Sequence, residues 1–307
     1  MATMMSRILV PVDFTLICHN AYRYALHLAE DLDLDVVLVH YYSGSIDPRS
    51  PLVIAGDGTI QGSQEERLRQ FAYASAEEPS YPLLEPPCNV AVTYEVEPAL
   101  RPAAAITRRA AAPDISLVVL PPRSSGSLLG KWLGSTATTV SETCDRPVYL
   151  VPPEARYRRP RQVVVADNKA TADPYPLWQL EELTVAYGAR VHFVHVEKPA
   201  RELALRYTPW PLMEELLEAE RDAELPFEVV TVEDKDISQG LLDYADTIDA
   251  DLLVIINQTR GHWQAVLRAS LTQDLTLRSS LPVLVLHVAR TATPAGSAGK
   301  QNKSMKT

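Results

Sequence analysis

Short apolar segments rich in Val, Leu and Ile recur along the chain, and within them apolar and polar residues do not alternate. Such runs are typical of strands buried on both faces of a parallel sheet. Stretches of helical length separate them. In the first stretch, over 20–34, four apolar residues fall on one helical face: Ala21, Ala25, Leu28 and Leu32. This alternation predicts a parallel α/β sheet with right-handed crossovers.

The same order of segments occurs twice. The matching strand-like segments are 8–14 and 163–168, 36–42 and 191–197, 115–122 and 251–257, and 146–151 and 281–286. A repeat of roughly 140 residues is too long for a solenoid unit, so it indicates two copies of one globular domain. We therefore expect two tandem copies of a five-stranded, mostly parallel open sheet with helices on both faces.

The expected helices and strands follow from the same pattern. Helices are expected at 20–34, 65–78, 102–112 and 135–145 in copy one, and near 174–187, 210–223, 237–248 and 270–279 in copy two. The strands of copy two are expected near 162–167, 190–196, 227–233, 251–257 and 282–288. Ser135 is the expected N-cap of the fourth helix of copy one.

The domain boundaries are expected at 1–152 for copy one, 153–161 for a linker and 162–290 for copy two. Copy one is roughly 20 residues longer, and 43–62, rich in Gly, Pro and Ser, predicts a long loop there. The linker region, 152–161, is rich in Pro and Arg, which favours an exposed, solvated segment over an anion site. The tail, 291–307, lacks apolar periodicity and is expected to be disordered.

Composition narrows the classes of function. The formal net charge of -10 argues against nucleic-acid and anionic-membrane partners, since both would repel the protein. No apolar run approaches the roughly 18 residues of a membrane span, and no signal peptide is visible before the first strand. Three cysteines without CxxC spacing indicate a reduced, cytoplasmic protein, and we find no metal-type cluster of Cys and His.

Ligands of open parallel sheets bind beyond the carboxyl ends of the strands. In copy one this edge is expected to gather three groups of residues: Pro11, Val12 and Asp13; His40 and Tyr41; and the loop 121–136. A Gly/Ser loop that leads into a helix can hold phosphate through backbone N–H groups, and Asp13 can accept a hydrogen bond from a ribose or base. His40 and its counterpart His195 are interpreted as structural, and Cys18 as a buried thiol rather than one activated by a helix dipole.

These segments resemble the universal stress protein family. The resemblance rests on PVDFT at 11–15, LVHYY at 38–42, LRPAAAI at 100–106 and LLGKWLGSTATTVSETCDRPVYLV at 128–151. It covers 6–152 well and 162–288 more weakly. It implies a Rossmann-like fold of the adenine-nucleotide alpha hydrolase kind, and ATP or AMP as the ligand in some branches. It also implies antiparallel pairing of the last strands, here 148–151 with 283–286 inside one chain, with further homodimerisation left open.

The binding branches of that family carry Gly-x-x-Gly, nine residues, and then Gly-Ser or Gly-Thr. Gly134 and Ser135 match the end of the pattern, but Pro121 and Ser124 stand where its first two glycines belong. Proline has no N–H to give a phosphate. The residues that the resemblance assigns to nucleotide binding are Pro11, Val12, Asp13, Tyr41, Pro121, Arg123, Ser124, Gly126, Gly134, Ser135 and Thr136.

Copy two departs further from the family pattern. Ile256, Thr259 and Ala269 replace its three glycines, and only Asp167, Gly261 and Ser270 match copy one at the cleft. We expect any nucleotide in copy one, and no nucleophile–base pair or carboxylate pair is evident in either copy. The favoured function is a stress-response regulator that acts through an unknown protein partner without turnover. The alternatives are an ATP-hydrolysing or nucleotidyl-transferring enzyme and an interaction scaffold with empty clefts.

Overall fold

A computed structural model describes residues 6–42, 58–73, 84–122, 134–166, 187–197, 226–257 and 271–287. Its strands are β1 (Arg7–Pro11), β2 (Asp35–Tyr42), β3 (Val92–Pro98), β4 (Ile115–Leu120), β5 (Val148–Leu150), β6 (Gln162–Ala166), β7 (Arg190–Glu197), β8 (Phe227–Glu233), β9 (Leu252–Asn257) and β10 (Val283–His287). Its helices are α1 (Leu16–Leu32), α2 (Gly58–Ala72), α3 (Pro102–Ala110), α4 (Ser135–Thr143) and α7 (Ile237–Thr247). Residues 271–278 are also helical.

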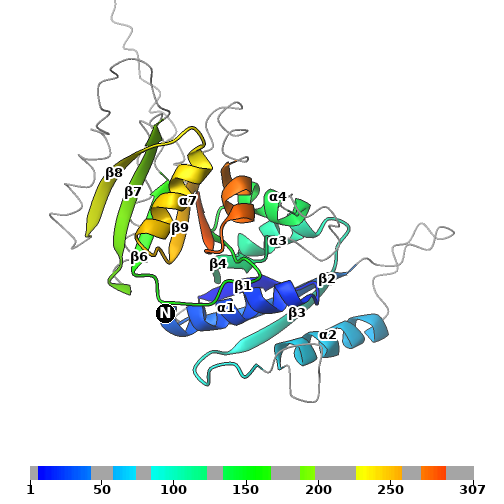
Figure 1. The fold of residues 1–307 in the computed structure, drawn as a ribbon. Coiled ribbons are helices and arrows are strands. Elements are labelled where there is room, and N and C mark those ends of the chain that lie inside the picture. Colours follow the sequence, from blue (N-terminus) through cyan, green and yellow to red (C-terminus); the bar gives the residue numbers. More distant parts are fainter. Residues whose placement is uncertain are drawn as a thin grey trace, which may run out of the picture.

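All the strands join one ten-stranded sheet with the order β3-β2-β1-β4-β5-β10-β9-β6-β7-β8. Each half therefore has the order 3-2-1-4-5, and the two copies lie side by side (Figure 1). Neighbours within a copy are parallel, as expected for strands joined by helices. The fold class predicted from the repeated apolar segments is confirmed.

The last strand of each copy joins the two half-sheets. β10 runs antiparallel to β5, with Val283 opposite Leu150 and Val285 opposite Val148. This is the intrachain pairing expected for the segments 148–151 and 283–286. On one face of the sheet, the His287 imidazole Nε2 lies 2.9 Å from the Ser141 carbonyl oxygen of α4. The joint removes an apolar, unpaired edge from each half, which would otherwise be free to pair with other chains.

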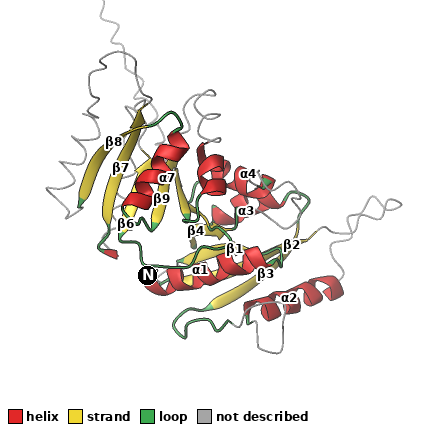
Figure 2. Ribbon diagram, viewed as in Figure 1, coloured by secondary structure: helices red, strands yellow, loops and turns green. Residues whose placement is uncertain are grey.

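Two cores cover the two faces of the sheet, and each one runs through both copies. In β1, Ile8 points to the core that holds α1 and α2, while Leu9 points to the core that holds α3 and α4. Figure 2 shows helices packed against the strands of both halves. Because successive side chains of a strand point to opposite faces, a sheet covered on both sides needs apolar residues at nearly every strand position. This explains the unbroken apolar runs in the sequence.

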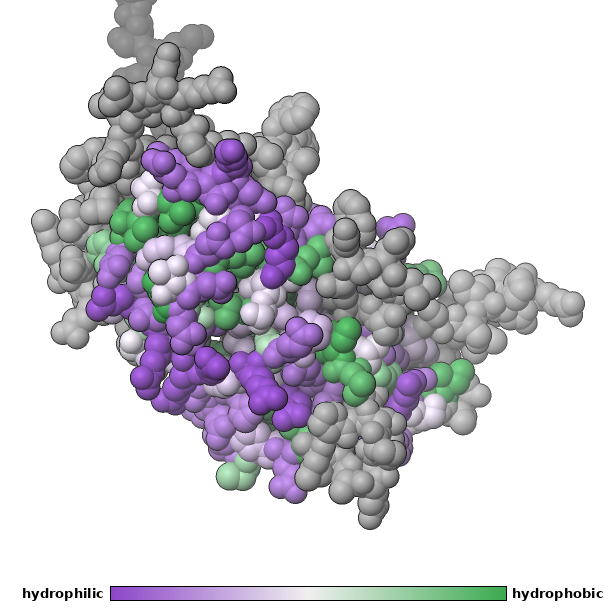
Figure 3. Space-filling model, viewed as in Figure 1, coloured by the Kyte–Doolittle hydropathy of each residue, from purple (hydrophilic) through white to green (hydrophobic). Residues whose placement is uncertain are grey.

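The outer surface is mainly polar. On the face seen in Figure 3, hydrophilic side chains dominate the described residues, and hydrophobic ones show only in small patches. The large apolar side chains that are exposed in the described part of the chain are Leu16, Ile60, Tyr73, Leu100 and Ile237. Isolated apolar residues of this kind are ordinary on a protein surface.

Several helix boundaries differ from the expectation. α1 begins at Leu16 rather than near residue 20, because the Thr15 side chain accepts a hydrogen bond from the Cys18 N–H and caps the helix earlier. The N-cap of α4 is Gly134, and Ser135 is its first helical residue, so the expected cap at Ser135 is wrong. The predicted loop 43–62 is also wrong in part, since α2 begins at Gly58.

The linker after β5 is not a freely solvated segment, which corrects the expectation for 152–161. Ala155 is buried, and the Asn20 side chain of α1 donates hydrogen bonds to the carbonyl oxygens of Pro152 and Ala155, both at 3.0 Å. Farther along the linker, Tyr157 packs against Tyr24 of α1, with ring centroids 5.1 Å apart. The linker is therefore held along the outer side of α1.

Some expectations lie outside the described residues. They are the helices at 174–187 (apart from its last residue) and 210–223, the segment 43–57 of the predicted loop, the end of the strand near 282–288, and the tail 291–307. The helices expected near 237–248 and 270–279 are present over 237–247 and 271–278.

Candidate functional site

A cavity of about 210 Å³ opens at the carboxyl ends of β1, β2 and β4, where the strand order of copy one reverses. This is the place where open α/β sheets bind ligands. Eight of the residues proposed from the sequence line it: Pro11, Val12, Asp13, Tyr41, Pro121, Gly134, Ser135 and Thr136. The other three, Arg123, Ser124 and Gly126, lie outside the described residues.

Six further lining residues were not among those proposed: Cys18, His40, Pro102, Ile106, Leu120 and Ala137. Pro102 and Ile106 are four residues apart and therefore lie on one face of α3. That spacing is visible in the sequence, but only the packing of α3 beside α4 brings this face to the cavity. The sequence does predict His40 at this edge beside Tyr41, but as a structural residue and not as a ligand-binding one.

The turn between β1 and α1 presents Asp13 at the cavity. The Asp13 Oδ1 atom accepts two hydrogen bonds from Thr15, one from the backbone N–H at 3.1 Å and one from the hydroxyl at 2.7 Å. Phe14, between them, has a φ of 61°, in the left-handed region that a bulky residue rarely occupies. A conformation of this kind costs about 1–2 kcal/mol, so the surroundings must hold it in place.

Aromatic contacts hold Phe14 in this conformation. Its ring lies 4.5 Å from the His40 ring and 5.9 Å from the Phe71 ring, measured between centroids. The Arg67 guanidinium carbon lies 4.0 Å from the Phe14 ring centroid, a cation–π arrangement. Residues of β2 and α2 therefore support the turn that carries Asp13.

His40 is neutral near pH 7 and supports the same turn. Burial lowers its pKa, and the Arg67 charge lowers it further. The hydrogen bond to Val12 and the negative charge of Asp13 raise it, but by less. Its Nδ1 lies 2.7 Å from the Val12 carbonyl oxygen, and since a carbonyl can only accept, Nδ1 carries the proton. The Val12 N–H in turn donates to the Val39 carbonyl at 2.7 Å. These contacts agree with the structural role expected for His40.

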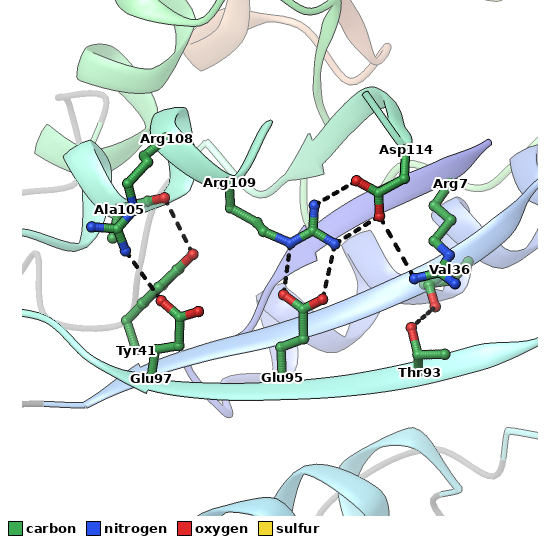
Figure 4. Close-up of polar contacts among 10 residues, drawn as sticks. All are labelled: Arg7, Val36, Tyr41, Thr93, Glu95, Glu97, Ala105, Arg108, Arg109 and Asp114. Atoms are coloured by element: carbon green, nitrogen blue, oxygen red, sulfur yellow. Dashed lines mark hydrogen bonds and ion pairs between the residues drawn. The ribbon is translucent and has the colours of Figure 1, made fainter. Parts of the chain in front are cut away.

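Tyr41 forms an aromatic wall of the cavity. Its hydroxyl donates to the Ala105 carbonyl oxygen of α3 at 3.3 Å (Figure 4), and burial raises its pKa to about 12. The phenol therefore stays protonated near neutral pH. With Pro102 and Ile106 on the adjacent face of α3, this side of the cavity is apolar and suits a flat organic group.

Ion pairs fix α3, and with it this wall, to the sheet. The Arg109 guanidinium bonds both oxygens of Glu95 in β3 and both oxygens of Asp114, at 2.8–2.9 Å (Figure 4). Asp114 also lies 3.6 Å from the Arg7 guanidinium at the start of β1. Bidentate pairs of this type are directional as well as strong, so they set the position of the helix.

The opposite side of the cavity is the N-terminus of α4. Gly134 caps this helix without a side-chain hydrogen bond, and its own N–H donates to the Pro122 carbonyl at 2.9 Å. The first residues of the helix, Ser135 and Thr136, line the cavity. Backbone N–H groups and the helix dipole at such an end favour an anionic group. Pro121, on the same side, is buried and has no N–H to contribute.

Cys18 lines the cavity as an unreactive thiol. Its Sγ donates to the Pro11 carbonyl oxygen at 3.2 Å. Burial raises the pKa of the thiol far above its ordinary value, and the Asp13 charge raises it further. The interpretation as a buried thiol is therefore supported, and the N-terminus of α1 does not activate it.

The described residues contain no group of three or more His, Cys, Asp or Glu side chains placed to hold a metal ion. Across the same residues, every helix is too short or too polar to span a bilayer.

At the corresponding edge of copy two, the structure describes fewer residues. His195 is buried in β7, at the strand position that matches His40 in β2, and Ile256 is buried in β9. Asp167, Thr259, Gly261, Ala269 and Ser270 lie outside the described residues, so the comparison of the two clefts remains one of sequence.

Comparison with known proteins places these features in a family. The model of the universal stress protein family matches the chain twice, over residues 4–152 and 160–287. The fold is similar to that of a universal stress protein from Archaeoglobus fulgidus, with 17% identity, a TM-score of 0.62 and coverage of 92% of this chain and 98% of that one. No match was found among curated proteins.

A Pseudomonas aeruginosa structure assigned to the same family is also similar, with 12% identity, a TM-score of 0.50 and coverage of 92% and 93%. At such identities the structural likeness establishes the fold, while the two family matches together span most of the sequence and coincide with the two half-sheets. The chain belongs to the universal stress protein family and carries two copies of its domain in tandem.

Proposed function

We propose that copy one binds an adenine nucleotide, ATP or AMP, in the cavity between β1, β2, β4 and α4, and that the protein is a stress-response regulator. The observation that carries this proposal is the arrangement of three unlike surfaces around one cavity. They are the Asp13 carboxylate, the N-terminus of α4 at Ser135, and the apolar wall of Tyr41 and Ile106. A nucleotide has a hydroxylated sugar, an anionic end and a flat base to match them.

In this proposal each of the three surfaces receives one part of the ligand. The base lies against Tyr41 and Ile106, the ribose hydroxyls or a base N–H donate to Asp13, and the phosphates face the α4 N-terminus. With Pro121 in place of a glycine, fewer backbone N–H groups reach the phosphates. We therefore expect weaker affinity than a full Gly/Ser loop provides, and AMP to retain most of the affinity of ATP.

Regulation without turnover is the form of activity that the described residues favour. Beside the cavity, His40 is engaged with Val12, and burial raises the pKa of the Cys18 thiol. The protonated Cys18 thiol is therefore not poised as a nucleophile, and the Nδ1–H of His40 serves to support the turn that carries Asp13. A bound nucleotide would act by changing the affinity for a protein partner. Three free cysteines, with Cys18 and Cys144 buried, support action in the reducing cytoplasm.

The test is calorimetric titration of AMP and ATP into the parent protein, the Asp13→Ala variant and the matched Asp167→Ala variant of copy two. Binding that Asp13→Ala weakens about tenfold and Asp167→Ala leaves unchanged supports the proposal. If Asp167→Ala abolishes binding and Asp13→Ala does not, the ligand lies in the other copy. Mass spectrometry of small molecules released from the purified protein provides a second readout, and release of ADP from ATP over time would favour the enzyme alternative.

A further inference from the structure

Thr15 is placed to control the direction of the Asp13 carboxylate. Both of its hydrogen bonds, from N–H at 3.1 Å and from Oγ1 at 2.7 Å, fall on the same oxygen, Oδ1. The second oxygen, Oδ2, keeps its lone pairs for a donor from a ligand. An exposed carboxylate without such partners samples several rotamers, whereas two donors on one oxygen favour a single orientation.

The Thr15 hydroxyl is itself held by a second contact. It accepts a hydrogen bond from the Cys18 N–H at 3.2 Å, as the N-cap of α1. With its acceptor side turned toward the helix, the hydroxyl directs its proton toward Asp13. One side chain thus connects the start of a long, buried helix to the carboxylate at the cavity.

The backbone between the two residues completes the arrangement. Phe14 is left-handed, with φ 61°, and this brings the Thr15 N–H round to the Asp13 side chain. The ring of Phe14 contacts the rings of His40 and Phe71, so the turn is set by the packing of β2 and α2 as well as by its own hydrogen bonds.

We infer that Thr15 is a positioning residue for ligand binding, which acts through Asp13 and does not itself touch the ligand. Thr15 does not line the cavity, whereas Asp13 does. The inference rests on the proposed function, since it concerns how the same cavity recognises a hydroxyl or N–H donor of the nucleotide. Its consequence is that the hydroxyl of Thr15 contributes to affinity only while the Asp13 carboxylate is present.

The test needs a Thr15 variant that loses the hydrogen bond to Asp13 but leaves the N-terminus of α1 stable. Thr15→Gly removes the hydroxyl, yet glycine at an N-cap lowers stability by only a few tenths of a kcal/mol relative to threonine. Thr15→Ser keeps both the cap and the donor, so it serves as the matched rescue variant. A double-mutant cycle of Thr15→Gly with Asp13→Ala then measures the coupling between the two side chains.

The experiment is calorimetric titration of AMP into the full-length parent, Thr15→Gly, Thr15→Ser, Asp13→Ala and the double variant, with thermal unfolding of each as a folding control. We expect Thr15→Gly to weaken AMP binding by roughly fivefold and Thr15→Ser to stay within about twofold. In the Asp13→Ala background, Thr15→Gly should have no further effect.

The outcomes distinguish this inference from the function on which it rests. If the parent binds neither AMP nor ATP, both are overturned. If the parent binds AMP and Thr15→Gly binds equally well, the positioning role is wrong and the proposed function stands. If Thr15→Gly weakens binding by the same factor with and without the Asp13 carboxylate, Thr15 acts independently of Asp13 and the inference is also overturned.

Discussion

The Tyr157 hydroxyl donates a hydrogen bond to the Asp31 carboxylate, and this contact fastens the linker between the two copies to the end of α1. Arg159, two residues on, donates to the same carboxylate at 2.7 Å. Near the start of α1, Asn20 binds the linker backbone. The linker is therefore part of the folded structure of copy one as well as the connection to copy two.

Removing the Tyr157 hydroxyl is expected to destabilise the protein. The Asp31 side chain is only 14% exposed, and Tyr157→Phe would take away a charge-assisted hydrogen bond there. We expect a loss of about 1–2 kcal/mol in the free energy of unfolding, measured from the midpoint of urea denaturation.

The control for Tyr157→Phe is a fully buried tyrosine beside the same helix. Tyr149 is 1% exposed, and its hydroxyl has no hydrogen-bond partner within the described part of the chain. Tyr149→Phe therefore breaks no described hydrogen bond and should not lower the free energy of unfolding. Equal losses in the two variants would show that ring packing, not the Tyr157–Asp31 bond, is responsible.

Mild acid is expected to destabilise the fold through its buried histidines. Burial lowers the pKa of His19 from 6.5 to about 4, and it also lowers the pKa values of His40, His192 and His287. Below pH 6.5 the unfolded chain takes up protons that the folded chain does not. The stabilisation due to neutral His19 is therefore complete above pH 6.5 and is lost as the pH falls toward 4.

The measurement is the free energy of unfolding between pH 7.5 and pH 4.5 for the parent and for His19→Gln. The lowered pKa of His19 limits the loss of unfolding free energy from its protonation to about 3 kcal/mol. Relaxation around the charge reduces the expected loss to roughly 2 kcal/mol. The variant, although less stable at pH 7, should show a shallower fall. Parallel curves would mean that His19 titrates with an ordinary pKa in the folded protein.

Arg109 is expected to contribute more to the stability of the fold than its neighbour Arg108. Arg109→Ala would leave the Glu95 and Asp114 carboxylates without their shared partner, and both side chains are only 27% exposed. We expect a loss of about 2 kcal/mol in unfolding free energy. Arg108→Ala should cost less than about 0.5 kcal/mol, since Arg108 is 70% exposed and its pair with Glu97 lies at the surface.

Restoring glycine at Pro121 and Ser124 together is expected to strengthen ATP binding. Proline removes one N–H donor beside the α4 N-terminus, and a gain of roughly tenfold would need only one recovered hydrogen bond to a charged group. The added freedom of the loop would offset part of this gain. The measurement is the dissociation constant for ATP of the parent and of the double variant at one salt concentration. Equal or weaker binding by a folded variant would favour the empty-scaffold alternative.

Local patterns in the sequence were sufficient for the repeat, the strands and most of the candidate site. A strand buried on both faces must be apolar along its length, so β1, β2, β4 and β6 could be recognised without a partner. Since the carboxyl ends of parallel strands share one edge, Asp13, Tyr41 and Ser135 could be grouped there before any contact was known.

The sequence pattern did not determine the exact helix starts. Gly134 rather than Ser135 caps α4, and Thr15 starts α1 early, because backbone angles decide which residue stands just outside a helix.

Contacts between distant segments had no local signal either. The linker sequence reads as polar, yet Tyr157 reaches Asp31, which is distant in sequence. Pro102 and Ile106 line the cavity only because α3 packs beside α4. Periodicity determines which face of an element is buried, whereas the partner of that face depends on the packing of the whole chain.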